Sequence, residues 1–118
     1  MSAARVLVLV RDLLLRSRID AVADALGVVV AYASSLEAAR ARCAELRPAA
    51  LFADLSDTSF PAGETATLRA IEPAMRLVGF ASHVDLKALK SAREAGFERT
   101  LSRSEFTAQL PELLRLRE

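Results

Sequence analysis

Short apolar runs alternate along the chain with segments in which apolar residues recur every three or four positions. An apolar run of four to eight residues indicates a buried strand, and a 3.6-residue period indicates an amphipathic helix. The apolar runs predict five strands, at residues 5–10, 28–32, 49–53, 76–81 and 98–101. The periodic segments between them predict five helices, the first of which carries Leu15, Ile19, Val22 and Leu26 on one face.

Capping and helix-breaking residues predict where the helices begin and end. Ser34 to Glu37 has the pattern of a capping box, with Ser34 as the N-cap of a second helix that Pro48 ends. Gly27 follows the first helix, at the place where a left-handed residue commonly closes a helix. The other three helices are predicted at residues 63–71, 85–96 and 107–117.

The strict alternation of strands and helices predicts parallel strands that are joined by right-handed helical crossovers. The first four strand runs are apolar on nearly every residue, as strands covered on both faces must be. We therefore expect an α/β fold, a three-layer, doubly wound domain around a five-stranded parallel sheet. The length fits one domain over residues 1–118, with no output domain after the last helix. The expected core residues are Val6, Val8, Val22, Leu26, Leu51, Ala53, Val78 and Leu89.

Composition and charge exclude several classes of protein. Sixteen basic and fifteen acidic residues leave a net charge of +1, without the basic cluster of a nucleic-acid-binding protein. The apolar runs are far shorter than the ~20 residues that cross a membrane, and the N-terminus lacks a signal-peptide pattern. Cys43 is the only cysteine, which excludes an internal disulfide and makes a reducing cytoplasm the expected compartment.

Polar side chains follow four of the predicted strands, at the point where each strand ends. They are Arg11 and Asp12, Asp54, Ser82 and His83, and Ser102, Arg103 and Ser104. In open parallel sheets, ligands bind outside the carboxyl ends of the strands, where the strand order reverses. Because Asp12 and Asp54 follow the first and third strands, we expect those strands to be neighbours, in the order 2-1-3-4-5. The polar edge is the candidate functional site.

The chain resembles a bacterial response-regulator receiver domain over nearly its whole length. The resemblance is carried by Pro48-Ala-Ala-Leu-Phe-Ala-Asp54-Leu and by Ala95-Gly96 followed by a short strand and Arg103. It implies the flavodoxin-like receiver fold, with Asp54 at the phosphoacceptor position. In receivers, an acidic pair after the first strand and the acceptor bind magnesium, and a Thr or Ser and a lysine clamp the phosphoryl group.

The resemblance also implies partners. A histidine kinase or another signalling protein of a two-component phosphorelay is expected, together with a homodimer through the fourth helix, fifth strand and last helix. That face carries Leu86, Lys90, Arg93, Glu98 and Arg99.

The chain departs from the receiver pattern at the acid pair, at the Thr/Ser position and at the lysine. Arg11-Asp12 stands where two acids are expected, so one hard oxygen ligand for magnesium is lost and a positive charge is placed near the metal position. Ala81 takes the Thr/Ser position, with Ser82 one residue later, and Arg103 replaces the lysine. We therefore expect a pseudo-receiver, with no required cofactor and at most a weak magnesium site at Asp12 and Asp54. We also expect Arg103 to pair with Asp54 or Asp12 in place of the metal, because a guanidinium forks onto carboxylates.

Three functions remain open at this stage. The first, which the departures favour, is a non-enzymatic receiver-like module that acts through protein–protein contacts. The second is a single-domain response regulator that accepts phosphate on Asp54 from a histidine kinase. The third is a small enzyme or nucleotide binder on a flavodoxin-like sheet.

Several candidate residues also have ordinary structural interpretations. Asp12 would N-cap the first helix, and Ser82 and Ser104 would supply hydroxyls at helix starts. His83 would be either a solvent-facing loop residue or a pH-sensing group of the site. The segment Arg16-Ser17-Arg18 has the pattern of a solvated basic patch.

Overall fold

The sheet has five parallel strands in the order β2-β1-β3-β4-β5, as predicted. The structure is a computed structural model and describes residues 5–115. The predicted range of β4 agrees with the observed one, those of β1 and β2 are one residue too long at one end, and those of β3 and β5 are shifted by one residue. The strands are β1 (Arg5–Leu9), β2 (Val29–Tyr32), β3 (Ala50–Asp54), β4 (Arg76–Ala81) and β5 (Arg99–Ser102).

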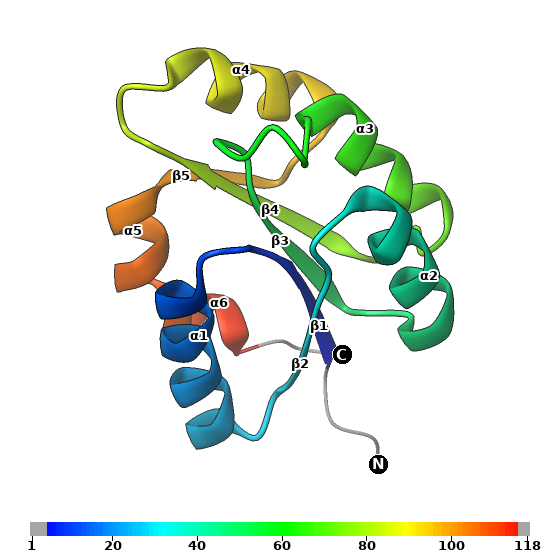
Figure 1. Cartoon of the computed structure of the whole chain (residues 1–118), viewed down its shortest axis with the longest axis vertical. Helices are drawn as coiled ribbons and strands as arrows, with labels where there is room; N and C mark the ends of the chain where they lie inside the picture. The colour runs from blue at the N-terminus through cyan, green and yellow to red at the C-terminus, as the bar shows by residue number, and fades with distance from the viewer. Residues whose placement is uncertain (1–4, 116–118) are drawn as a thin grey trace.

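Helices cover both faces of the sheet, which confirms the three-layer, doubly wound arrangement (Figure 1). One face is covered by α2 (Leu36–Leu46), α3 (Ala62–Ala66), the 3-10 turn η1 (Thr67–Ala70) and α4 (Leu86–Ala95). The other face is covered by α1 (Leu13–Leu26), α5 (Arg103–Ala108) and α6 (Leu110–Leu114). Among residues 5–115, no helix combines the length and the apolar character needed to span a membrane.

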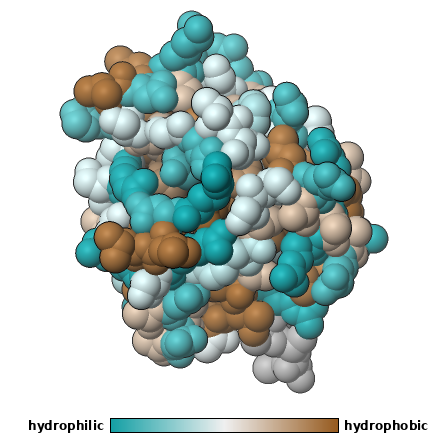
Figure 2. Space-filling model, in the orientation of Figure 1, coloured by the Kyte–Doolittle hydropathy of each residue, from teal (hydrophilic) through white to brown (hydrophobic). Residues whose placement is uncertain are grey.

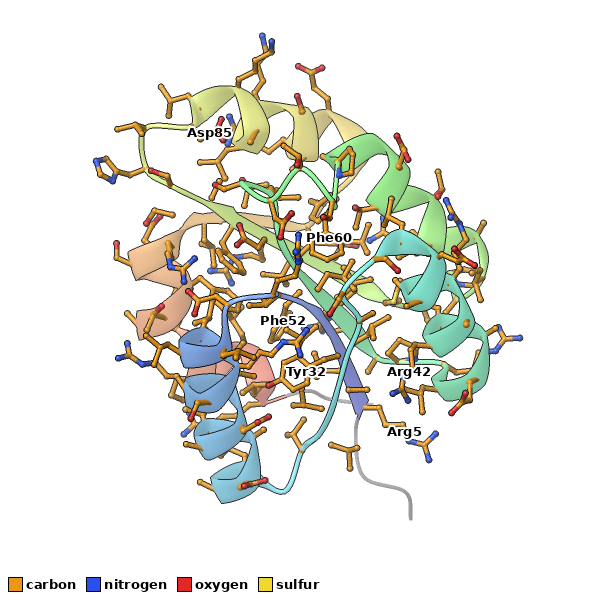
Figure 3. All side chains as sticks on the ribbon, in the orientation of Figure 1. Arg5, Tyr32, Arg42, Phe52, Phe60 and Asp85 are labelled. Atoms are coloured by element: carbon orange, nitrogen blue, oxygen red, sulfur yellow. The ribbon has the colours of Figure 1, made fainter. Side chains whose placement is uncertain are left out.

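Each face of the sheet has its own apolar cluster. On the side of α1 and α5, the ring of Phe106 stacks on that of Phe80, with centroids 4.2 Å apart, and meets the edge of Phe52. Phe60 is fully buried in the cluster on the opposite side (Figure 3). Aromatic pairs in these geometries add to the free energy gained from burial, so Phe106 anchors α5 to the sheet.

Six of the eight predicted core residues are buried, and the other two are not. Val22 is only half-buried, and Leu26 is 36% exposed. Ala23 occupies the core position at the C-terminal end of α1, and Leu26 lies in the last turn, where Gly27 takes a left-handed conformation and directs the chain toward β2. The predicted burial of Leu26 was therefore wrong.

The predicted start of the second helix was wrong by one residue. Ser35, not Ser34, is the N-cap of α2, and its Oγ accepts a hydrogen bond from the Ala38 N–H at 3.1 Å. The hydroxyl of Ser34 instead accepts a hydrogen bond from Arg16. A complete capping box occurs at the start of α5, between Ser102 and Glu105.

The third and fifth predicted helix ranges were also wrong in part. The range 63–71 is a short α3 followed by the 3-10 turn η1. The range 107–117 is replaced by α5 and α6, which meet at Gln109, and its end lies outside the described residues. Because proline lacks an N–H and is tolerated only in the first turn of a helix, Pro111 begins a new helix and does not continue α5.

Candidate functional site

The carboxyl ends of the strands bring the predicted site residues to one edge of the sheet. Asp12 lies just beyond β1 and Asp54 ends β3, and these strands are neighbours, with Leu9 in register with Ala53. Arg103 begins α5 directly after β5. The topology thus places two carboxylates and one guanidinium together, as the sequence predicted.

Asp12 has the capping role that its position predicts. Its Oδ1 accepts hydrogen bonds from the N–H groups of Leu14, at 2.9 Å, and Leu15, at 3.2 Å. The Leu15 N–H is the main reason that the pKa of the Asp12 carboxyl lies below its usual value. Desolvation opposes it, and the Leu14 N–H and Arg103 add to the lowering. Asp12 is therefore an ionised carboxylate with one oxygen fully used by α1.

The guanidinium of Arg103 lies between the two acids. Its Nη2 donates to Oδ2 of Asp12, and its Nη1 is 3.8 Å from Oδ2 of Asp54. The predicted ion pair is therefore present and reaches both carboxylates. The capping box of α5 fixes the backbone that carries Arg103, because the Ser102 and Glu105 side chains each bind the other's backbone N–H.

Asp54 is the more enclosed acid, with its side chain only 13% exposed. Oδ1 accepts a hydrogen bond from the Ser56 N–H at 3.0 Å. Burial raises the pKa of the Asp54 carboxyl, and the Ser56 N–H and Arg103 oppose that rise only in part. Both oxygens of this carboxylate therefore face donors of the protein.

Arg11 does not occupy the space between Asp12 and Asp54, contrary to expectation. Its Nη1 lies 3.2 Å from the Ser59 hydroxyl and 3.7 Å from Oδ1 of Asp57, both in the loop after β3. Asp57 was missed in the sequence, although its place in the polar run that follows Asp54 could have indicated it. Arg11 therefore ties the loop after β1 to the loop after β3.

The residues after β4 supply little to the centre of the site. Ala81 ends the strand, is buried and has no polar side-chain atom. The Ser82 N–H donates to the Ser56 hydroxyl at 3.1 Å, and His83 is exposed. The N-caps of α4 and α5 are Asp85 (labelled in Figure 3) and Ser102, so the expected helix-start role was wrong for Ser82. Ser104 lies in the first turn of α5, with its hydroxyl 3.3 Å from that of Ser102.

Arg16 is not part of a solvated basic patch. Its guanidinium lies over the Tyr32 ring, 4.6 Å from the centroid, and donates to the Val10 carbonyl and to Ser34. The Tyr32 hydroxyl donates to Asp20 at 2.6 Å, which attaches the end of β2 to α1 (Figure 3). Of the two arginines in that segment, only Arg18 lacks an ion pair or side-chain hydrogen bond within residues 5–115.

Glu98, which the sequence places on the expected dimer face, also has partners within the chain. Its carboxylate pairs with Arg69 and accepts a hydrogen bond from the Leu77 N–H at 2.8 Å. This acid is therefore used within the chain, near the start of β4. The rest of the predicted face keeps Leu86, Lys90, Arg93 and Arg99 exposed.

The donor set does not fit a magnesium ion. Mg²⁺ requires octahedral oxygen ligands, several of which are usually water, together with one or more free carboxylates. One Asp12 oxygen caps α1, and the oxygens of Asp12 and Asp54 that face each other are in contact with a guanidinium. Within residues 5–115, no cluster of three or more His, Cys, Asp or Glu side chains has the geometry of a metal site.

Comparison with solved structures identifies the fold as that of response-regulator receiver domains. The chain superposes on a response regulator from Thermotoga maritima with a TM-score of 0.81 at 14% identity, covering 97% of this chain and 96% of that one. A putative response regulator from Chloroflexus aurantiacus gives 0.82 at 18% identity, with the same coverage of 97% and 96%.

A third similar structure holds a metal at its site. It is the receiver domain of a sensor histidine kinase from Pseudomonas aeruginosa, with magnesium coordinated in its active-site cleft. It matches with a TM-score of 0.79 at 16% identity, over 97% of this chain and 96% of that one. No protein-family model and no curated protein matches the sequence. At these identities, the likeness establishes the receiver fold.

Proposed function

We propose that this protein is a receiver-like signalling module that acts through contacts with other proteins, without catalytic activity of its own and without magnesium-dependent phosphorylation of Asp54. The observation that supports this function is the Arg103 guanidinium between Asp12 and Asp54. It supplies, as part of the chain, the positive charge that a bound cation would otherwise bring to two neighbouring carboxylates.

The geometry around Asp54 explains why phosphorylation is not expected. A carboxylate that accepts a phosphoryl group needs a free oxygen and cations arranged around the transferring phosphate. Oδ1 of Asp54 is bound by the Ser56 N–H, and Oδ2 faces Arg103, which is shared with Asp12. Ala81 contributes no hydroxyl at the end of β4.

Intact-mass measurement after incubation with a small phosphodonor and magnesium tests this function. We expect no phosphoadduct on the unaltered protein. The combined substitutions Arg11→Asp, Ala81→Thr and Arg103→Lys restore the receiver pattern, and this variant should gain an adduct that Asp54→Ala removes. An adduct on the unaltered protein that disappears in Asp54→Ala would instead establish a phosphorylatable response regulator.

The signalling partners are part of the same proposal. A histidine kinase or another signalling protein remains the expected class, in the reducing cytoplasm where a free, buried Cys43 is stable. A homodimer through α4, β5 and α5 also remains a prediction. Sedimentation at micromolar concentration measures it, and a monomer under those conditions would contradict the homodimer.

A further inference from the structure

We propose that a groove between α1 and α5 is the docking site for an acidic segment of a partner protein that carries leucine-like side chains on both sides of its carboxylates. The inference rests on the proposed function, in that it assigns a surface and a partner chemistry to a protein that acts through protein contacts. The surface, named here the α1–α5 groove, is formed by Leu14 and Arg18 of α1, Arg103 and Thr107 of α5, and Ser82 and His83 after β4.

The α1–α5 groove consists of two adjoining hollows that share Arg18, Arg103 and Thr107. The larger hollow, of about 570 Å³, continues to Ser82 and His83, and the smaller, of about 210 Å³, reaches Leu14. Because the two hollows share three lining residues, they adjoin, and together they offer more room than a small ion needs.

The charge of the groove is complementary to carboxylates. No acidic residue lines the larger hollow, and Asp12, which borders the smaller one, has its oxygens engaged by α1 and Arg103. Arg18 makes no ion pair within the described part of the chain. With the hydroxyl of Ser82, it supplies hydrogen-bond donors that carboxylates accept.

Exposed apolar side chains stand at both ends of the groove. Leu13 and Leu14 are 74% and 85% exposed at the start of α1, and Val84 and Leu86 are 75% and 70% exposed at the start of α4. Figure 2 shows hydrophobic surface at these two places, with hydrophilic surface between them. Of the six exposed large hydrophobic residues in the described chain, Leu14 therefore lines the groove, and three more lie within three residues of its lining at Leu14 and His83.

The combination of charge and apolar surface identifies the occupant. A small anion would bind at Arg18 but would leave both apolar ends in water. A nucleic acid would need a larger excess of basic residues than a net charge of +1 provides. A protein segment with central carboxylates and flanking leucines covers the apolar ends and pairs with Arg18 at the same time.

A synthetic peptide with four central glutamates between two pairs of leucines tests the groove directly. Titration into the 15N-labelled protein should shift the amide signals of Leu14, Arg18, His83 and Thr107, and the counterpart peptide with glutamines should bind much more weakly. Arg18→Glu should lower the affinity by at least about tenfold, because it reverses the charge opposite the carboxylates. Arg42→Glu makes the same change on α2, away from the groove (Figure 3), and should leave the affinity unaltered.

The spectra of the two variants also report whether each remains folded, so that a loss of affinity can be assigned to the surface. Three results would overturn the proposal: no shifts at millimolar peptide, equal losses in Arg18→Glu and Arg42→Glu, or equal binding of the glutamine peptide. Concentration-dependent shifts of the same signals without peptide would assign the groove to a second copy of the chain and also overturn it. A phosphoadduct on Asp54 would refute the proposed function but leave these readouts unchanged, so the two failures are distinguishable.

Discussion

Asp12 and Asp54 lie at the ends of neighbouring strands, yet their surroundings shift their pKa values in opposite directions. Asp12 accepts two backbone N–H groups, and its pKa is lowered. Asp54 is enclosed at the end of β3, and its pKa is raised mainly by burial. Arg103 donates its hydrogen bond to the first and lies 3.8 Å from the second. The fold therefore disfavours the ionised form of Asp54 and favours the ionised form of Asp12.

Asp54→Asn should stabilise the protein at neutral pH. The pKa of Asp54 is higher in the folded state than in the unfolded state, so its protonated form favours folding. This contribution to stability is present below the unfolded-state pKa and is lost as pH rises through the folded-state pKa. Asparagine removes the charge and keeps an oxygen for the Ser56 N–H. Urea denaturation should therefore give a higher midpoint for the variant at pH 7, and the difference should disappear near pH 3.

Asp12→Asn is the control of opposite sign. The pKa of Asp12 is lower in the folded state than in the unfolded state, so its ionised form favours folding. This contribution to stability is present above the unfolded-state pKa and is lost as pH falls through the folded-state pKa. This variant keeps a good N-cap but should have a lower midpoint than the unaltered protein at pH 7. Shifts of the same sign in both variants would contradict the assignment.

At the scale of the elements, the start of α2 gives a test with a matched control. Ser35→Ala removes the hydroxyl that accepts from the Ala38 N–H and should cost about 1 kcal/mol of unfolding free energy. Ser34→Ala removes only an exposed contact with Arg16 and should cost less than about 0.5 kcal/mol. Chemical denaturation measures both. A larger loss for Ser34→Ala would show that the sequence pattern had located the cap correctly.

The strand pattern was predictable because a strand that is buried on both faces consists of four or five consecutive apolar residues. The strand order followed from one further fact, that Asp12 and Asp54 end strands which must be adjacent at a switch point. The choice between Ser34 and Ser35 was not predictable in this way. It depends on Arg16, which reaches Ser34 from α1 while lying over Tyr32.

The positions of the site residues were predictable from the strand order, but their side-chain partners were predictable only in part. Strand ends fix the positions of Asp12, Asp54 and Arg103, so their proximity follows from topology. The partner of Arg11 depends on the conformation of the loop after β3, where Asp57 and Ser59 lie. Such long-range side-chain contacts leave no periodic pattern in the sequence.

At the scale of the whole molecule, Arg103 links parts of the chain that are far apart in the sequence. Its hydrogen bond to Asp12 joins residues 91 positions apart and links α5 to the start of α1. Phe106, one turn further along α5, packs on Phe52 and Phe80 of the sheet. The guanidinium and the ring therefore hold α5 in place together, and the α1–α5 groove depends on that placement.

Removing Arg103 should make the stability of the whole domain depend on magnesium. In the unaltered protein, 10 mM magnesium should leave the melting temperature unchanged, because the guanidinium already compensates the two carboxylates. In Arg103→Ala, Asp12 and Asp54 face each other without a cation, so the melting temperature should fall. Magnesium that binds this variant with millimolar affinity should raise its melting temperature again by about 4 °C, since a ligand that binds only the folded state stabilises it. Arg42→Ala, on α2, should show neither effect. Thermal scans with and without magnesium measure all three proteins, and a magnesium-dependent rise in the unaltered protein would show that its acids still form a cation site.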